Sequence, residues 1–378
     1  MIGNLDTTTL QNLWWFICSA LGALFIFLTF VQGGQTMLFT LASTAEEKSL
    51  LVNSLGRKWE LTFTTLVVFG GAMFAAFPLF YATSFGGAYW VWVSILFTFI
   101  VQAVSYEYRS KPGNLLGTGT YDLFLFINGS VGILLIGAAV GTFFSGSNFS
   151  LNAMNQVTWQ HPLRGLEAAF SLFNLSLGLF LVFHARTMGA LYLANNIDHK
   201  VLHRRANNAV LINFAISLPF LLFVLVRLVT MQGFGVDPVS GTVALTDGKY
   251  LANLLSLPVI PAFLLVGLIL VIGGVVVNGL QGKKNGIWLA GLGTVLVGLA
   301  IFFTAGYNNT SFYPSKIDLA SSLTIRNASS SHYTLTVMSY VALAVPFVVA
   351  YIFYFWRLMD MKKISMAELS GEQAKELY

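Results

Sequence analysis

Nine long apolar runs, separated by short polar stretches, are the feature that most constrains this 378-residue chain. About 20 helical residues span the roughly 30 Å apolar core of a bilayer. Charged residues make up only 9% of the chain, too few for the surface of a soluble protein. We therefore predict an all-α, polytopic membrane protein forming a single membrane domain over residues 1–378. The expected spans lie near 13–32, 61–82, 87–106, 121–145, 166–190, 209–231, 252–277, 286–307 and 335–357.

Most Lys and Arg residues lie in the segments that follow odd-numbered spans, on one side of the expected membrane, and this imbalance predicts the orientation of the chain. Four (Arg164, Lys249, Lys316 and Arg326) follow the even-numbered spans, and Arg227 lies inside span 6. Cytoplasmic loops are enriched in Lys and Arg, so we expect the N-terminus outside and the C-terminus in the cytoplasm of a bacterial inner membrane. Basic residues spread between apolar runs do not predict nucleic-acid binding. The fifteen on the expected cytoplasmic side are Lys48, Arg57, Lys58, Arg109, Lys111, Arg186, Lys200, Arg204, Arg205, Lys283, Lys284, Arg357, Lys362, Lys363 and Lys375.

Two further expectations concern what the chain lacks. The first basic residue is Lys48 and the first apolar run is long enough to span, so no cleaved signal peptide is expected. Cys18 is the only cysteine, which excludes a cysteine-ligated metal or iron–sulfur cluster. Of five histidines, only His184 lies well inside an apolar run, without a partner at matching depth for a haem. We expect no metal and no cofactor bound by this chain.

Three carboxylates lie where apolar runs meet the expected cytoplasmic boundary. Glu60 begins span 2, Glu107 ends span 3, and Asp122 begins span 4. Ionisable groups at membrane depth are costly and are therefore functional candidates. Short connections would bring the three acids to one inner-face funnel that exchanges protons with the cytosol. The alternative is structural pairing with neighbours such as Arg109 or Lys111, and spacing alone does not decide between the two.

Several stretches resemble subunit II of the cytochrome bd-type quinol oxidases. Each is weak alone, but their order, their spacing and the chain length are together specific. Between about 145 and 305 the resemblance rests on the number of spans only. The matching stretches are Asn-Ser at 53–54, Trp-Glu at 59–60, Gly-Gly-Ala-Met-Phe-Ala-Ala-Phe-Pro at 70–78, Tyr-Glu-Tyr-Arg-Ser-Lys at 106–111, Tyr-Asp at 121–122, Asn-Gly-Ser at 128–130, Pro-Ser at 314–315, Ser-Leu-Thr-Ile-Arg-Asn-Ala-Ser-Ser at 322–330, Thr-Leu at 334–335 and Met338.

The resemblance implies a fold, partners and site residues. It implies two four-helix bundles plus one peripheral helix, and a haem-bearing subunit I that holds haem b and haem d and oxidises quinol. The enzyme would be the oxygen-reducing complex, with membrane lipid, quinone and small accessory subunits as further partners. The resemblance also implies a proton pathway through Glu60, Glu107 and Asp122. Trp59, Arg109 and Lys111 lie in the same motifs and are expected to support that pathway or the subunit interface.

The chain departs from the family at the end of its first span. An Asp-Gly-Phe-Asp-like motif is common there, whereas this chain has Gln32, two glycines and Gln35. Amides do not accept and release protons as carboxylates do, so an acid relay at these positions is lost. Gln102 replaces a frequent arginine, and residues 61–65 also differ. The chain is therefore a divergent member, with a proton path that need not follow the family's.

Two rival functions remain open from the sequence. One is a proton-coupled secondary transporter, in which Glu60, Glu107 or Asp122 couples a solute to protons. Against it, no pair of Gly- or Pro-broken spans is expected to carry polar groups near the bilayer midplane. The other is a purely structural membrane subunit with no role in proton transfer.

Overall fold

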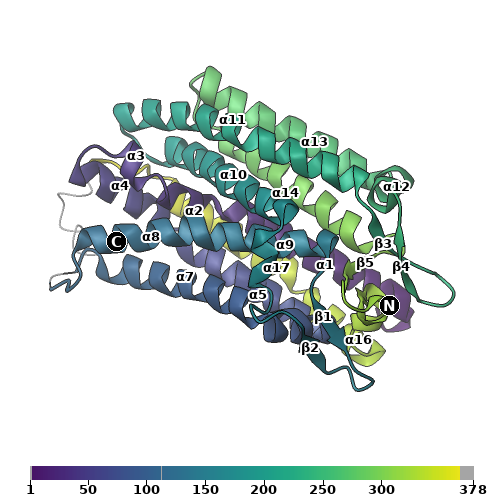
Figure 1. Cartoon of the computed structure of the whole chain (residues 1–378). Coiled ribbons are helices and arrows are strands. Elements are labelled where there is room, and N and C mark those ends of the chain that lie inside the picture. Colours follow the sequence, from purple (N-terminus) through teal and green to yellow (C-terminus); the bar gives the residue numbers. More distant parts are fainter. Residues whose placement is uncertain (1, 112, 367–378) are drawn as a thin grey trace.

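The computed structural model describes residues 2–111 and 113–366 of the chain (Figure 1). This part contains nine helical segments that are long and apolar enough to cross a membrane, which confirms the number of spans predicted. The segments are Thr7–Gln35, Ala45–Ala76, Tyr89–Tyr108, Thr118–Ser145, Leu172–Asn196, Lys200–Thr230, Val259–Leu280, Gly286–Gly306 and His332–Asp360.

Five of these segments contain more than one helix, because irregular turns interrupt them. The spans comprise α1 (Thr7–Leu28) with α2 (Phe30–Gln35), α4 (Ala45–Gly56) with α5 (Trp59–Ala76), α7 (Tyr89–Tyr108), α8 (Thr118–Ile127) with the π-helical turn Asn128–Gly132 and α9 (Ile133–Ser145), α10 (Leu172–Asn196), α11 (Lys200–Thr230), α13 (Val259–Val275) with the π-helical turn Val276–Leu280, α14 (Gly286–Gly306), and α16 (His332–Ala342) with α17 (Val345–Asp360). Shorter helices connect them: Ile2–Asn4, α3 (Leu38–Leu41), α6 (Pro78–Phe80), the π-helical Tyr81–Gly87, the 3-10 turns Leu166–Phe170 and Leu319–Ser321, α12 (Lys249–Ser256) and α15 (Ile325–Ala328).

The fifth span is displaced from its predicted bounds of 166–190. Leu166–Phe170 forms a 3-10 turn instead, and the extended backbone of Ser171 (ψ of 130°) separates this turn from α10, which begins at Leu172. At the other end the helix continues to Asn196, although asparagines are poor helix formers. Hydrogen bonds from Asn195 to the Lys284 carbonyl and from Asn196 to the Asp360 carboxylate satisfy these amides. Such long-range partners explain why local hydropathy placed this end too early.

Helix α10 is the centre of the packing, in contact with α2, α9, α11 and α14. Glycines permit the closest approaches. A Cβ on Gly137 of α9 would lie 2.6 Å from the Cα of Gly178 in α10, and one on Gly33 of α2 would lie 1.9 Å from the Ala185 carbonyl oxygen. Because no side chain intervenes, backbones pack directly against each other, as is common between membrane helices. In contrast, α17 has no buried residue and lies at the periphery.

The two ends of the helix array differ in structure. All three two-stranded antiparallel sheets lie at one end, here called the hairpin end, where the chain also begins (Figure 1). Their strands are β1 (Phe149–Leu151) with β2 (Val157–Trp159), β3 (Gly233–Val236) with β4 (Val243–Thr246), and β5 (Ser311–Tyr313) with β6 (Leu323–Thr324). The other end, here called the basic end, holds the helix termini at Gln35, Ala45, Tyr108, Thr118, Asn196, Lys200, Leu280, Gly286 and Asp360. A separate hydrophobic core supports each end, one around Trp59 and Tyr192 and one around Trp15 and Phe312.

Candidate functional site

The three acids predicted from the sequence all lie at the basic end, but in two different environments. Asp122 is buried, with 2% of its surface exposed. Glu60 and Glu107 are exposed. Neither Glu60 nor Glu107 has a hydrogen bond or ion pair to any residue in the described ranges 2–111 and 113–366. The three carboxylates therefore do not form one equivalent set.

Asp122, in the first turns of α8, is held by two cations. Its Oδ1 lies 2.7 Å from Nε of Arg109, at the end of α7, and its Oδ2 lies 3.1 Å from Nζ of Lys48 in α4. The ion pairs thus join three helices beside a cleft of about 310 Å³. Both carboxylate oxygens are engaged, as a buried charge requires. Arg109, predicted as a supporting residue, makes this contact, whereas the Lys111 side chain is exposed.

Glu60 and Glu107 each follow a member of a stacked aromatic pair. The rings of Trp59 and Tyr106, which precede them in sequence, stack with centroids 5.7 Å apart and planes inclined by 10°. Further along the same helices, Phe63 contacts Phe99, so α5 and α7 run antiparallel. Each residue of an α-helix is rotated by about 100° from the one before it. When two residues face each other across a pair of antiparallel helices, the residues that follow them therefore point to the same side of the pair. Glu60 and Glu107 therefore project on one face of the basic end.

Buried amides form a cluster beside the aromatic pair. Gln35 donates from Nε2 to the Tyr106 hydroxyl at 2.9 Å, and Gln32 donates from Nε2 to Oε1 of Gln102 at 3.4 Å. Asn128, in the π-helical turn, donates from Nδ2 to the Thr98 hydroxyl at 3.4 Å, one helical turn from Gln102 on α7, and the four amide side chains have no exposed surface. One polar atom of each lacks a protein partner: Gln32 Oε1, Gln35 Oε1, Gln102 Nε2 and Asn128 Oδ1. Buried polar atoms of this kind are characteristically bridged by ordered water.

Two interrupted spans meet at this cluster. Helix α1 gives way to α2 at Thr29, and α8 gives way to α9 at the π-helical turn Asn128–Gly132. This turn packs directly against α2, since a Cβ on Gly129 would lie 2.1 Å from the Gln32 carbonyl oxygen. The local sequence of either span did not reveal this contact.

A buried ion pair at the basic end was not predicted as a pair. Nζ of Lys58 lies 3.1 Å from Oδ1 of Asp360, and the Lys58 side chain has no exposed surface. The ammonium group also lies 4.8 Å from the centre of the Trp356 ring. Asp360 accepts a second hydrogen bond from Asn196. These contacts fasten the end of the peripheral helix α17 to α5 and α10, and residues about 300 positions apart offer no local signal of such a pair.

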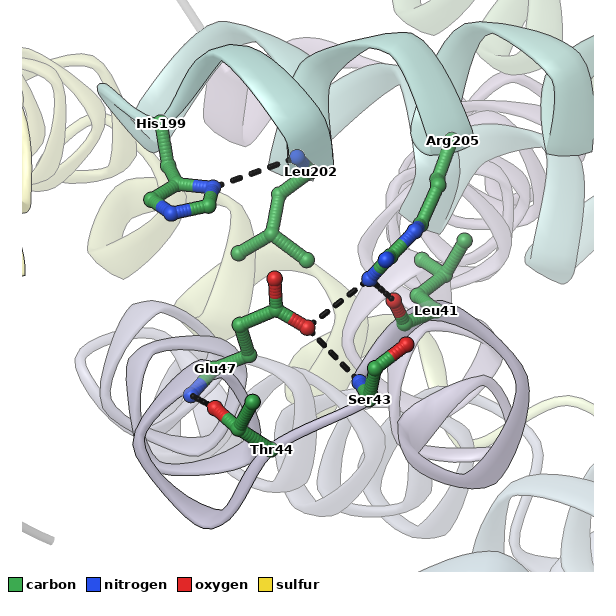
Figure 2. Close-up of polar contacts among 7 residues, drawn as sticks. All are labelled: Leu41, Ser43, Thr44, Glu47, His199, Leu202 and Arg205. Carbon is green, nitrogen blue, oxygen red and sulfur yellow. Dashed lines mark hydrogen bonds and ion pairs between the residues drawn. The ribbon is translucent and has the colours of Figure 1, made fainter.

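A second missed contact ties the turn between α3 and α4 to α11, as Figure 2 shows. Oε2 of Glu47 accepts hydrogen bonds from the Ser43 amide at 2.7 Å and from Arg205 at 2.8 Å. The same Arg205 nitrogen donates to the Leu41 carbonyl, and Thr44 caps α4. The Thr44–Glu47 spacing is a helix-start signal, but nothing in it predicts the distant arginine.

The histidines do not offer a pair of haem ligands within the described residues. Nε2 of His184 lies 2.9 Å from the Thr294 hydroxyl, and its ring stacks on Phe180 beside an apolar cavity. His199 and His203 lie at the start of α11, at the basic end, and His161 and His332 lie at the hairpin end. No group of three or more His, Cys, Asp or Glu side chains suited to a metal occurs in residues 2–111 and 113–366.

Comparison with known proteins identifies the family. The family "Cytochrome bd terminal oxidase subunit II" matches residues 10–359. The chain is 27% identical over 372 residues to cytochrome bd-I ubiquinol oxidase subunit 2 of Escherichia coli, covering 94% of this chain and 95% of that one. It is 27% identical over 365 residues to a probable cytochrome oxidase subunit 2 of Haemophilus influenzae, covering 93% of each chain.

A relative from a different bacterial group and a solved structure agree with this result. Cytochrome bd ubiquinol oxidase subunit 2 of Bacillus subtilis is 25% identical over 354 residues, covering 90% of this chain and 93% of that one. The fold is similar to a chain in the structure of bd oxidase from Geobacillus thermodenitrificans, with a TM-score of 0.56 and 13% identity, covering 92% of this chain and 98% of that chain. The resemblance seen in the sequence motifs is confirmed, and the chain belongs to the cytochrome bd terminal oxidase subunit II family.

Proposed function

We propose that this chain is the haem-free second subunit of a bd-type quinol:oxygen oxidoreductase in an aerobic respiratory chain. Its partner is a haem-bearing subunit I, which holds haem b and haem d and oxidises quinol. Two relatives named as ubiquinol oxidase subunits align with 94% and 90% of this chain, which supports the assignment. The absence of a facing histidine pair in the described residues fits a chain that leaves haem binding to its partner. Small accessory subunits, lipid and quinone complete the set of proposed partners.

The proposed orientation places the basic end in the cytoplasm and the N-terminus outside. Fourteen of the 19 Lys and Arg residues in the described ranges belong to the basic end, which supports this orientation by the positive-inside rule, and the fifteenth assigned from the sequence, Lys375, lies outside the described residues. Arg186 is one of the fourteen, although it lies inside α10, where it donates hydrogen bonds to Asn213 and Thr36. With this orientation the chain spans the bacterial inner membrane nine times. Two four-helix bundles and one peripheral helix remain the proposed arrangement.

The exposed faces of α5 and α7 are the proposed surface for subunit I. Large apolar side chains are exposed along them, including Phe74 at 60% on α5 and Phe97 at 61% on α7. The peripheral helix α17 adds more of the same kind, with Phe347 at 78%. Glu60 and Glu107 lie at the cytoplasmic rim of the α5 and α7 faces. A partner that covers these faces would therefore meet two unpaired carboxylates.

Proton uptake through Glu60 and Glu107 is the proposed contribution to catalysis. The observation that carries it is that both carboxylates are unpaired, exposed and turned to one side beside the stacked Trp59. A carboxylate in contact with cytosolic water can accept a proton and pass it on to a neighbouring group. The sequence analysis grouped Asp122 with these two acids. Its ion pairs with Arg109 and Lys48 instead support a positioning role, in which Asp122 holds Arg109 and thereby the end of α7. Lys111 remains available for attracting the partner.

Purification tests the assignment to an oxidase. The chain, isolated from membranes through an affinity tag, is expected to retain a larger haem-bearing partner and to show a haem d absorption band. Isolation without haem, together with proton-driven uptake of a solute by vesicles containing the chain alone, would favour a transporter instead.

Substitution tests the proton role. Glu60→Gln and Glu107→Gln remove the carboxylates without changing side-chain volume, and we expect quinol-driven oxygen consumption to fall at least about tenfold in the double variant. Glu46→Gln is the matched control, because Glu46 is also an exposed glutamate at the basic end. Assembly and haem content are measured in parallel. Full oxygen consumption in an assembled double variant would leave the chain with a structural role only.

A further inference from the structure

An amphipathic cleft of about 630 Å³ lies at the hairpin end, the end opposite the candidate site. Residues from the first turns of α1 and α13, from the end of α14, and from β6 and α15 line it. Helices α1, α13 and α14 belong to segments that can cross a membrane, and their ends mark the level at which the apolar interior gives way to headgroups. The cleft therefore opens at the height of one lipid headgroup layer.

The membrane-facing part of the cleft is aromatic and aliphatic. Phe16 of α1 and Phe263 of α13 both pack against Phe303 of α14, with ring centroids 6.0 and 6.2 Å apart. Phe16 is 45% exposed, so its ring is available to a molecule in the cleft. Leu257 and Val259 extend this wall. This apolar wall could be covered by the acyl chain of a lipid.

The outer part of the cleft is polar and carries a cation, Arg326, that has no ion pair with any described residue. Arg326 is exposed and donates one hydrogen bond, from a terminal nitrogen to the Pro238 carbonyl at 3.2 Å. No Asp or Glu occurs among the described residues that line the cleft, whereas Asn12 and Asn309 do line it. Lys249 brings a second cation to the wall, through a hydrogen bond to the Asn308 carbonyl at 2.6 Å.

The carboxylates that are near cleft residues in the sequence are engaged with backbone amides. Asp237, which follows the cleft residue Val236, accepts hydrogen bonds from the amides of Val239 and Ser240. Asp6 precedes the cleft residue Thr8 and accepts hydrogen bonds from the amides of Thr8 and Thr9, capping α1. Its interaction is thus with the positive end of a helix rather than with Arg326. Among the described residues that line the cleft, Arg326 is the charged side chain.

We propose that this cleft binds an anionic phospholipid, with the phosphate at Arg326 and an acyl chain along Phe16 and Phe263. A guanidinium group with several unused donors is well suited to a phosphodiester, and the neighbouring amides supply further donors. The apolar wall distinguishes a lipid from a free phosphate ion, which would gain nothing from it. The site is independent of the proposed proton uptake, because it lies at the other end of the molecule.

Native mass spectrometry of the full chain, purified with its bound partners, tests the proposal. The protein is exchanged into mixed micelles of phosphatidylglycerol and phosphatidylcholine, and the lipids retained per complex are counted. We expect wild type to prefer phosphatidylglycerol and Arg326→Gln to lose about fivefold of that preference. Arg164→Gln is the matched control, because Arg164 is exposed at the same end but packs over Tyr89, outside the cleft. It should retain the wild-type preference.

A charge-reversal variant and a competition experiment test the same site independently. Arg326→Glu is expected to reverse the preference toward phosphatidylcholine, while the thermal unfolding midpoint stays within the range of the other variants. Excess inorganic phosphate should not displace the retained lipid. An unchanged lipid preference in both Arg326 variants would refute the site, and displacement by inorganic phosphate would show a simple anion site instead of a lipid site.

Discussion

The basic end contains two kinds of carboxylate, and their difference separates structure from function. Asp122 and Asp360 are each held by a buried or nearly buried cation, and each joins helices that are remote in sequence. Glu60 and Glu107 are exposed, and within the described residues they have no such partner. A buried charge is tolerated only when it is paired, so the first pair of acids is committed to holding the fold. The second pair remains available for a proton or a partner subunit.

The largest expected effect comes from removing the buried cation. Lys58→Met would leave the Asp360 carboxylate without its ion-pair partner, and we expect a loss of about 3–5 kcal/mol in the free energy of unfolding. The thermal unfolding midpoint of the purified complex measures this. The double variant Lys58→Met/Asp360→Asn should recover most of the loss, because no uncompensated charge remains. A single variant as stable as wild type would mean that this pair does not fasten α17.

A somewhat smaller loss is expected at Asp122. Asp122→Asn removes the charge that faces Arg109 and Lys48, at a cost of about 3 kcal/mol. The cost is below that of Lys58→Met because the Lys48 side chain is 25% exposed and can turn to water. Thermal unfolding again provides the measurement, with Glu107→Gln as the control at an exposed acid. Wild-type stability but lost oxygen consumption in Asp122→Asn would return this residue to the proton pathway.

The neutral amides should be less costly to disrupt than either ion pair. Gln102→Leu leaves the Gln32 side chain without its acceptor, and we expect a loss of about 1–2 kcal/mol. The double variant Gln32→Leu/Gln102→Leu removes both partners and should be closer to wild type in its unfolding midpoint. If the double variant is instead the worse of the two, the cluster depends on bound water that both amides hold.

The smallest effect on stability is expected at the exposed pair. Glu60→Gln and Glu107→Gln should each change the free energy of unfolding by no more than about 0.5 kcal/mol, as is usual for surface positions. This result, together with the loss of oxygen consumption proposed above, would separate the two kinds of carboxylate. Destabilisation comparable to that of Asp122→Asn would show that Glu60 or Glu107 also holds the fold.

The helices were predictable from the sequence to a greater extent than the site. The nine apolar runs identified the nine segments, because the preference of a run for the membrane depends mainly on its own composition. Errors fell where distant contacts satisfy polar groups, as at Asn195 and Asn196, which extend α10 beyond its apolar run. The acids were also found, since a charge at the end of an apolar run is conspicuous. Their division into paired and unpaired groups was not predictable.

The sequence by itself determined the nine segments, within residues 2–111 and 113–366, that are long and apolar enough to cross a membrane, and its motifs identified its family. Both conclusions rest on local properties, the apolar content of each run and short patterns of neighbouring residues. Only the tertiary structure decided that Lys58 meets Asp360, that two interrupted helices share an amide cluster, and that Glu60 and Glu107 turn to one face. These relations depend on how helices pack, rotate and pair across hundreds of residues, and no local window of sequence contains that information.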